Sequence, residues 1–237
     1  MKKTLYINTL PFLLVVFTYC NGITARDEKK TDSTVNVATN APATANKEGE
    51  PTPFSSMNPI DTAAYDRISH ELANGDTSGK WPVKAPYPSP GAILPFHRIL
   101  AFYGNLYSKR MGVLGEYPKD EMIAKLKGEV KAWQAADTSI PIIPALHYVA
   151  VTAQGAPGKD GKFRARMPFH QIDTIINWAN EIKGLAFVDI QVGLSTLQAE
   201  VPALEKYLAM PNVHLAIDPE FAMLGKGGKR PGSVIGT

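Results

Sequence analysis

The feature that most constrains the fold of this chain is the alternation of short apolar runs with amphipathic segments between residues 98 and 221. The apolar runs have the length of buried strands, and the amphipathic segments carry apolar residues three or four positions apart, as helices do. A repeated strand–helix–strand order predicts parallel strands that are joined by right-handed crossovers. The alternation therefore predicts an α/β fold that is built on a parallel sheet.

Four strands and three crossover helices are expected in this region. The expected strands are 98–104, 140–153, 185–193 and 213–221, and the expected helices are 118–137, 169–183 and 197–208. Pro144 is expected to make the second strand irregular, and Pro202 is expected to split the last helix. The last strand begins with the apolar run VHLAI and ends in turn residues, a pattern typical of a strand that is buried on both faces.

The lengths of the connections favour a barrel. Two of the three loops that follow a strand exceed ten residues, whereas each connection from a helix to a strand is only a few residues long. Long loops gathered at one face match the functional face of a (β/α) barrel. Because an eight-stranded barrel takes about 250 residues, residues 98–237 predict a TIM-barrel-like domain with only its first four β/α units, as a truncated or half barrel. A short open sheet and a dimer of halves are the alternatives.

The amino-terminal segment has the composition of an export signal. Residues 1–19 carry Lys2 and Lys3, followed by an apolar core that is short for a membrane span. Cys20 is the only cysteine of the chain, and it lies where a bacterial lipoprotein carries its lipidated cysteine. We therefore expect an exported protein that a lipid on Cys20 anchors in the bacterial cell envelope. The large residue before Cys20 departs from the usual lipoprotein signal, so the alternative is cleavage after Ala25 and a secreted or periplasmic protein.

The composition of the rest of the chain sets further limits. Residues 20–60 are rich in Thr, Ala, Asn, Pro, Lys and Glu, and a disordered tether is expected there. Residues 61–97 predict a short helix at 61–72 and then a proline-rich lead-in to the domain at 98–237. Removal of the signal leaves 23 basic and 22 acidic residues, and no basic run favours nucleic acid as a partner.

Acidic and amide side chains gather at the ends of the third and fourth strands. Asp218 and Glu220 are two residues apart, as are Asp189 and Gln191. Each pair is therefore expected to point to one face of its strand. Two carboxylates can divide the roles of acid and base in glycoside cleavage, so Glu220, Asp218 and Asp189 are catalytic candidates and Gln191 is a candidate substrate contact. The same oxygens could hold Ca²⁺ or Mg²⁺, or the acids could pair with loop arginines and lysines as structural groups.

Three further residues are candidate substrate contacts. Tyr103 and Asn105 end the first strand and could stack on a sugar ring and hydrogen-bond to it. His147 could act as a base, although a single histidine in an apolar strand is more often a core residue. The five histidines show no metal-binding spacing. No metal site and no cofactor are predicted beyond the Ca²⁺ or Mg²⁺ alternative.

Several short motifs resemble those of an uncharacterised family of bacterial secreted proteins and lipoproteins. They are YGN at 103–105, MGVLGE at 111–116, PGKDG at 157–161, DIQVG at 189–193, AIDPEF at 216–221 and IGT at 235–237. The resemblance covers about residues 98–237 and implies export and a barrel-shaped fold. Glu220 is also similar to the acid/base glutamate that many barrel glycoside hydrolases place after their fourth strand, which is an analogy of fold alone.

Together these features favour an exported hydrolase that acts on a glycan or a related polymer of the cell envelope. The alternative is a non-catalytic lipoprotein that binds a glycan or another ligand with the same residues. In both cases the expected partner is a carbohydrate or another small molecule, and the membrane is reached only through the lipid anchor. The sequence makes no prediction of the oligomeric state.

Overall fold

The computed structural model describes residues 59–229. The expected export signal, Cys20 and nearly all of the expected tether lie outside the described residues, as do residues 230–237. None of the helices within residues 59–229 has the length and the apolar character that a membrane-spanning helix needs.

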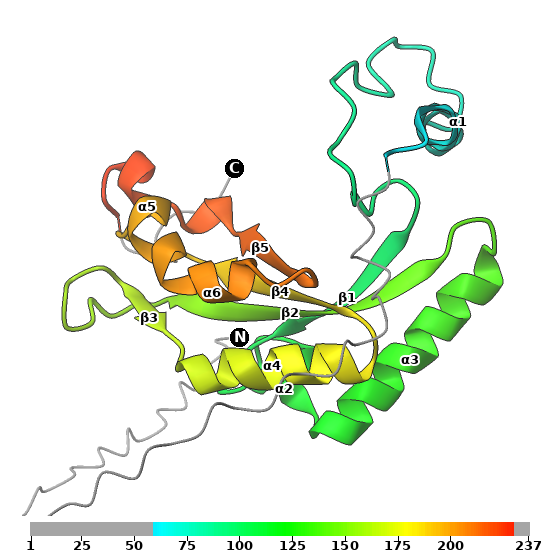
Figure 1. Cartoon of the computed structure of the whole chain (residues 1–237). Coiled ribbons are helices and arrows are strands. Elements are labelled where there is room, and N and C mark those ends of the chain that lie inside the picture. Colours follow the sequence, from blue (N-terminus) through cyan, green and yellow to red (C-terminus); the bar gives the residue numbers. More distant parts are fainter. Residues whose placement is uncertain (1–58, 230–237) are drawn as a thin grey trace, which may run out of the picture. The chain divides into compact units, whose positions relative to one another are not determined.

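Four parallel strands form the centre of the structure (Figure 1). They are β1 (Arg98–Gly104), β2 (Ile142–Ala153), β4 (Leu185–Ile190) and β5 (Val213–Ile217), and they pair in that order. The α/β class with a parallel sheet is therefore confirmed. The described strands form an open sheet and not a closed barrel, because β1 and β5 are its two edges and do not pair with each other.

A short fifth strand was not expected. β3 (Arg164–Arg166) lies within the long loop after β2 and pairs antiparallel with residues 151–153, at the end of β2. The irregularity in β2 falls between Val149 and Val151, where the pairing with β4 shifts. The expectation that Pro144 would interrupt the strand is wrong, since Pro144 pairs in register with Leu100. The bulge lies instead where β2 continues beyond β1, and bulges bend a strand.

The helices lie where the sequence predicted them, except for the short α2, which forms in a segment that was expected to be a loop. They are α1 (Thr62–Leu72), α2 (Val113–Glu116), α3 (Lys119–Ala136), α4 (Phe169–Glu181), α5 (Leu197–Glu200) and α6 (Glu205–Leu208). The side chain of Asp61 caps α1 by accepting a hydrogen bond of 2.9 Å from the backbone N–H of Ala64. Pro202 splits the last segment as expected, because it lies in the 3₁₀ turn η1 (Val201–Leu204) between α5 and α6.

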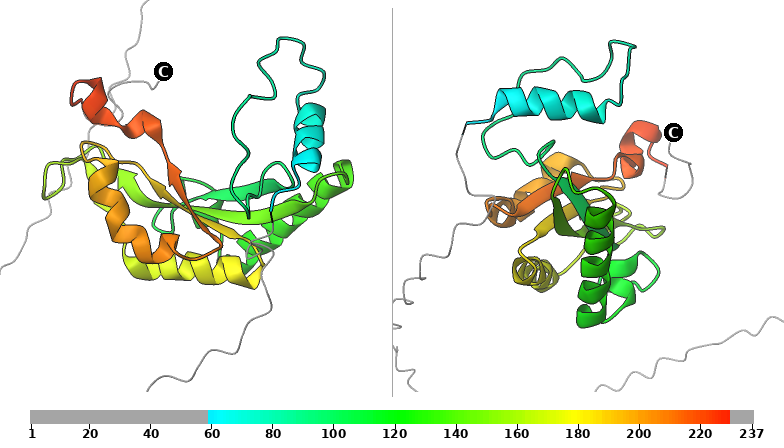
Figure 2. Two further views of the ribbon diagram at one scale, coloured as in Figure 1. Left: turned by 45° about the horizontal axis from the view of Figure 1, so that its top comes forward. Right: turned by 90° about the vertical axis from the view of Figure 1, so that its right-hand side faces the viewer.

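The crossover helices all lie on one face of the sheet (Figure 2). α3 contacts β1 and β2, α4 contacts β2 and β4, and α6 contacts β5. This follows from the strand order, since right-handed crossovers between successive neighbours must all return on the same side. The opposite face carries no crossover helix within residues 59–229, and we call it the open face.

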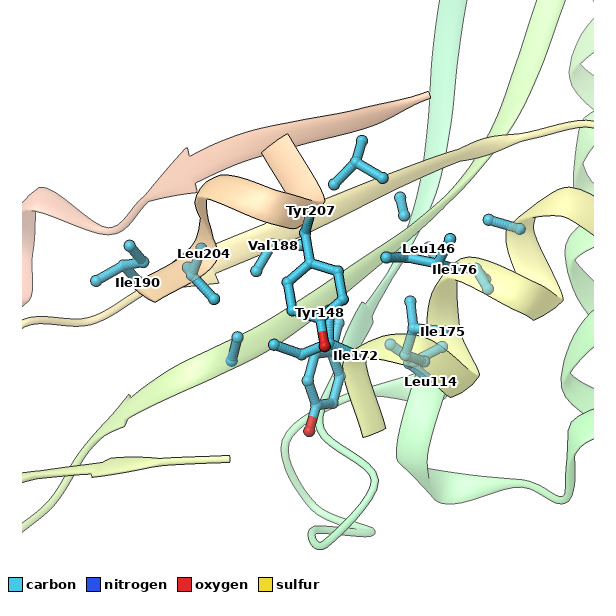
Figure 3. Packing of buried hydrophobic residues seen from close by; sticks show 14 of the residues in the cluster. Leu114, Leu146, Tyr148, Ile172, Ile175, Ile176, Val188, Ile190, Leu204 and Tyr207 are labelled. Carbon is cyan, nitrogen blue, oxygen red and sulfur yellow. The ribbon is translucent and has the colours of Figure 1, made fainter. Parts of the chain in front are cut away.

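The main core lies between these helices and the sheet (Figure 3). Side chains of β2 and β4 point toward α4 and are buried, and they pack against apolar residues of α4, η1 and α6. The residues labelled in this packing include Leu146, Tyr148, Ile172, Ile175, Ile176, Val188, Ile190, Leu204 and Tyr207. The hydroxyl of Tyr148 donates a hydrogen bond to the side-chain oxygen of Gln171, so this buried polar group is satisfied.

A smaller apolar cluster occupies the open face at the amino-terminal part of the sheet. Its members are the buried residues Ile143, Ala145 and Leu185, with Ile93, Ile99 and Phe187 packed against them. Ala145 and Leu146 are successive residues of β2, so they point to opposite faces of the sheet. Ile93 belongs to the proline-rich lead-in, which therefore ends by packing on the sheet.

One expectation about burial is wrong. The segment 213–221 was expected to form a strand buried on both faces, but β5 ends at Ile217. Leu215 and Ile217 are 36% and 43% exposed. The reason is that β5 is an edge strand, and within residues 59–229 no helix covers the side of it that lies away from β4.

Candidate functional site

Four ring side chains form a row across the open face. Tyr103 of β1 pairs with His147 of β2, His147 with Phe187 of β4, and Phe187 with His214 of β5. Successive ring centroids along this row are 5.1, 5.6 and 5.5 Å apart. Phe187 and His214 were not among the expected site residues. Strand alternation could have found them, because Phe187 lies two residues before Asp189 and His214 lies four residues before Asp218.

Asp189 lies directly beyond this row and is fully buried. Its Oδ2 lies 3.1 Å from Nε2 of His147, which is close enough for charge pairing, although the two atoms are not aligned as a hydrogen bond. Within residues 59–229 its Oδ1 has no hydrogen-bond partner. A buried carboxylate oxygen without a donor is costly. Asp189 is therefore the residue of this site whose carboxylate most clearly lacks a hydrogen-bond donor.

Gln191 connects three parts of the site. Its Oε1 accepts a hydrogen bond of 3.0 Å from the backbone N–H of Ala153. Its Nε2 donates to Oδ2 of Asp218 at 2.7 Å and to the hydroxyl of Tyr103 at 3.2 Å. These contacts fix the orientation of the amide, and they bring together the end of β1, the end of β4 and the residue that follows β5.

The electrostatics of the site favour the protonated forms of Asp218 and Tyr103. Burial raises the pKa of Asp218, and the charges of Asp189 and Glu220 raise it further, while the hydrogen bond from Gln191 opposes them. Burial also raises the pKa of Tyr103, with the nearby charges of Asp218, Asp189 and Glu220 adding to it. Tyr103 is therefore a hydroxyl donor at neutral pH, and Asp218 is a more basic carboxylate than an ordinary aspartate.

Glu220 lies within a turn and not on a strand. Strand alternation predicted that Asp218 and Glu220 would share one strand face, but Pro219–Phe221 forms the 3₁₀ turn η2. Glu220 is exposed, and its charge nevertheless acts on both Asp218 and Tyr103. Glu220 therefore belongs to the rim of the site, and Asp218 lies deeper in it.

Asn105 uses its amide to hold the backbone. It is buried, its Nδ2 donates to the carbonyl oxygen of Val149 at 2.8 Å, and its Oδ1 accepts from the N–H of Tyr107 at 2.8 Å. These bonds fix the loop after β1. A direct contact between Asn105 and a substrate stays a prediction.

Comparisons of the chain with protein-family models, with curated proteins and with solved structures found no match.

Two glycines allow the loop after β1 to pack closely. A Cβ atom on Gly112 would lie 2.2 Å from the carbonyl oxygen of Tyr103, and one on Gly115 would lie 2.1 Å from the carbonyl oxygen of Asn105. Only glycine permits backbones to approach this closely. The motif MGVLGE thus packs against the motif YGN, and this packing presents Tyr103 to the open face.

A buried ion-pair network lies beside the site and was missed by the sequence analysis. Glu200 is buried and accepts hydrogen bonds from Nε of Arg164 at 2.8 Å, from Nε of Arg166 at 2.6 Å and from the hydroxyl of Ser195. Loop arginines were considered as partners of the acids at the strand ends, but these two bind Glu200 instead. The available signal was their spacing, since residues two apart on a strand share a face and can reach one carboxylate.

A groove elsewhere in the structure does not contain the candidate chemistry. It is a groove of about 920 Å³ beside the start of β1, and its lining includes the exposed side chains of Trp81 and Trp133. None of the candidate site residues lines it.

Within residues 59–229, no three His, Cys, Asp or Glu side chains converge as metal ligands would.

Proposed function

We propose that this chain is an exported hydrolase of the bacterial cell envelope that cleaves a glycan or a related polymer on the open face of its sheet. The observation that carries the proposal is the pair Asp189 and Asp218, which lie at the carboxyl ends of neighbouring strands with Gln191 bonded between the strand ends. Ligands of parallel α/β folds bind at this end of the strands. The proposal includes a TIM-barrel-like architecture, which is supported by the sequential order of the parallel strands and by the helices on one face.

In this proposal Asp218 is the proton donor. An acid catalyst that works near neutral pH needs a pKa above that of an ordinary carboxyl group, and the environment of Asp218 shifts its pKa in that direction. Asp189 supplies the second carboxylate, as base or nucleophile, and His147 orients it at 3.1 Å. Tyr103 positions the substrate by donating a hydrogen bond, Gln191 holds Tyr103 and Asp218 in place, and the row of rings offers apolar faces to sugar rings. Glu220 remains a further acid candidate at the rim.

A non-catalytic glycan-binding lipoprotein is the second candidate. The observation that favours it concerns the side-chain amide of Gln191. The amide already forms hydrogen bonds with Ala153, Tyr103 and Asp218. A preformed polar cluster of this kind also serves ligand binding without turnover.

The first test is Asp218→Asn, which preserves the shape of the side chain and removes its acidic proton. Turnover should fall by about two orders of magnitude or more, the usual contribution of general acid–base catalysis, while substrate affinity changes little. Release of reducing ends from cell-envelope polysaccharide measures turnover. Glu129→Gln, on the exposed surface of α3, is the control with the same change of charge. A wild-type protein that binds the polysaccharide without cleaving it supports the binding protein, and an Asp218→Asn variant with full turnover contradicts the assigned role.

The second test concerns the lipid anchor. Labelled palmitate should be incorporated into the wild-type protein and not into Cys20→Ala, because Cys20 is the only cysteine that a lipid could modify. Gel analysis of the membrane fraction measures the label. Equal labelling of both proteins contradicts the anchor, and retention of the wild-type protein in the cytoplasm contradicts export.

A further inference from the structure

The two acids of the site, the buried Asp189 and the half-buried Asp218, differ in their charge partners from Glu200, the other buried acid within residues 59–229. Glu200 is held by Arg164 and Arg166. Within residues 59–229, by contrast, neither Asp189 nor Asp218 forms an ion pair with a lysine or an arginine. Their polar contacts are with His147 and Gln191. The chain thus supplies arginines where it buries a structural carboxylate, and it leaves the carboxylates of the open face without them.

Asp189 provides an independent observation that a donor is missing. It is 0% exposed, and its Oδ1 has no partner among the described residues. Burying a carboxylate oxygen without a hydrogen bond is strongly unfavourable. A ligand that carries a positive charge and several donors would satisfy it, and an ammonium group offers three donors.

We infer that the open-face site selects a glycan that carries a free ammonium group, as an amino sugar without its acyl group does, over neutral and anionic glycans. The half-buried carboxylate of Asp218 accepts a hydrogen bond from the ammonium, and the charge of the buried Asp189 adds to the attraction. Tyr103 and Phe187 border this position on the same face, and aromatic rings attract cations. This inference rests on the proposed glycan-binding function and names the class of its substrate.

The same charges disfavour acidic glycans. A carboxylate or phosphate on the ligand would lie near Asp189, Asp218 and Glu220, and among the described residues it would find no lysine or arginine paired with Asp189 or Asp218. Like charges that meet in a partly buried site repel each other, which lowers the affinity. Uronic acid polymers are therefore expected to bind weakly.

The test is calorimetric titration of the full chain with three oligosaccharides of equal length. They are a glucosamine tetramer, its N-acetylated counterpart and a uronic acid tetramer. The glucosamine tetramer should bind at least about tenfold more tightly than the N-acetylated one, the difference that one hydrogen bond to a charged group makes. The preference should decrease as the salt concentration rises, because salt screens charge interactions.

Variants separate the role of the two acids from general effects of charge. Asp218→Asn should abolish the preference for the ammonium, while the control Glu129→Gln should retain it. If Asp218→Asn does not fold in a thermal unfolding experiment, Asp189→Asn serves as the second variant and should reduce the preference.

The outcomes separate this inference from the proposed function. Equal affinity for the glucosamine and N-acetylglucosamine tetramers overturns the inference, even if the protein hydrolyses one of them. A clear preference without any hydrolysis supports the inference and leaves the protein as a binding protein. A lysine tripeptide that binds as tightly as the glucosamine tetramer overturns the assignment to a glycan.

Discussion

Glu200→Ala should lower the free energy of unfolding by about 3 kcal/mol, because removal of one partner of a buried ion pair leaves the other charge uncompensated. The side chain of Glu200 is 0% exposed, and that of Arg164 is 8% exposed. We place the loss at the lower end of the usual range of about 3–5 kcal/mol. The reason is that Arg164 retains a contact of 2.8 Å with Asp160, while Arg166 is half exposed and can reach water.

The control for this variant is Glu181→Ala. Glu181 pairs with Lys119 at 2.6 Å, but its side chain is 52% exposed, and exposed pairs contribute only about 0–1 kcal/mol. Urea unfolding followed by circular dichroism measures both variants. If the two variants lose the same amount of stability, the network around Glu200 does not hold β3 to α5 as described.

The effect of Glu200 should also depend on pH. Burial opposes its ionisation, but the hydrogen bonds from Arg166, Ser195 and Arg164 outweigh burial and lower its pKa below the ordinary value of 4.5. The unfolded chain therefore binds this proton more readily than the folded protein does. The stabilisation is fully present above pH 4.5 and is lost as the pH falls through the lowered pKa of the folded state. The difference between wild type and Glu200→Ala should accordingly narrow in acid.

Gly115→Ala should destabilise the protein by about 3 kcal/mol, the upper end of the usual cost of overpacking. The new Cβ would lie 2.1 Å from the carbonyl oxygen of Asn105 and 2.6 Å from that of Ser108. Both atoms belong to the backbone, so no side-chain rotation relieves the overlap. The loop would shift, and with it the hydrogen bond from Asn105 to Val149 that holds the end of β1 beside Tyr103.

Gly128→Ala is the matched control and should have the opposite sign. Gly128 lies inside α3, and a Cβ there would meet no atom within 4 Å. Alanine is favoured over glycine in a helix by about 0.5–1 kcal/mol, so this variant should be more stable than wild type. Gly115 also lies in a helix, and helix propensity alone would predict the same gain. Denaturant unfolding of the two variants decides between them, and a stabilising Gly115→Ala contradicts the close packing of the loop.

The sequence by itself determined the class of the fold and the place of its elements. Apolar periodicity predicted β1, α3, α4 and β4 closely, because a strand or helix that buries one face must repeat its apolar residues with the period of its backbone. It also identified Asp189 and Gln191 as neighbours at the end of one strand. Pro202 was recognised as the point where the last helix divides, since proline lacks the N–H that a helix needs.

Only the tertiary structure decided which side chains meet. The row from Tyr103 to His214 depends on the register of three strand pairs, and each register is set by packing between segments far apart in the sequence. The pairing of Glu200 with Arg164 and Arg166 joins residues more than thirty positions apart, and nothing local distinguishes Glu200 from other helical glutamates. The exposure of β5 likewise follows from its position at the edge of the sheet. The local pattern of apolar residues predicts whether a segment is a helix or a strand. Which elements lie next to each other is determined by the packing of the whole domain.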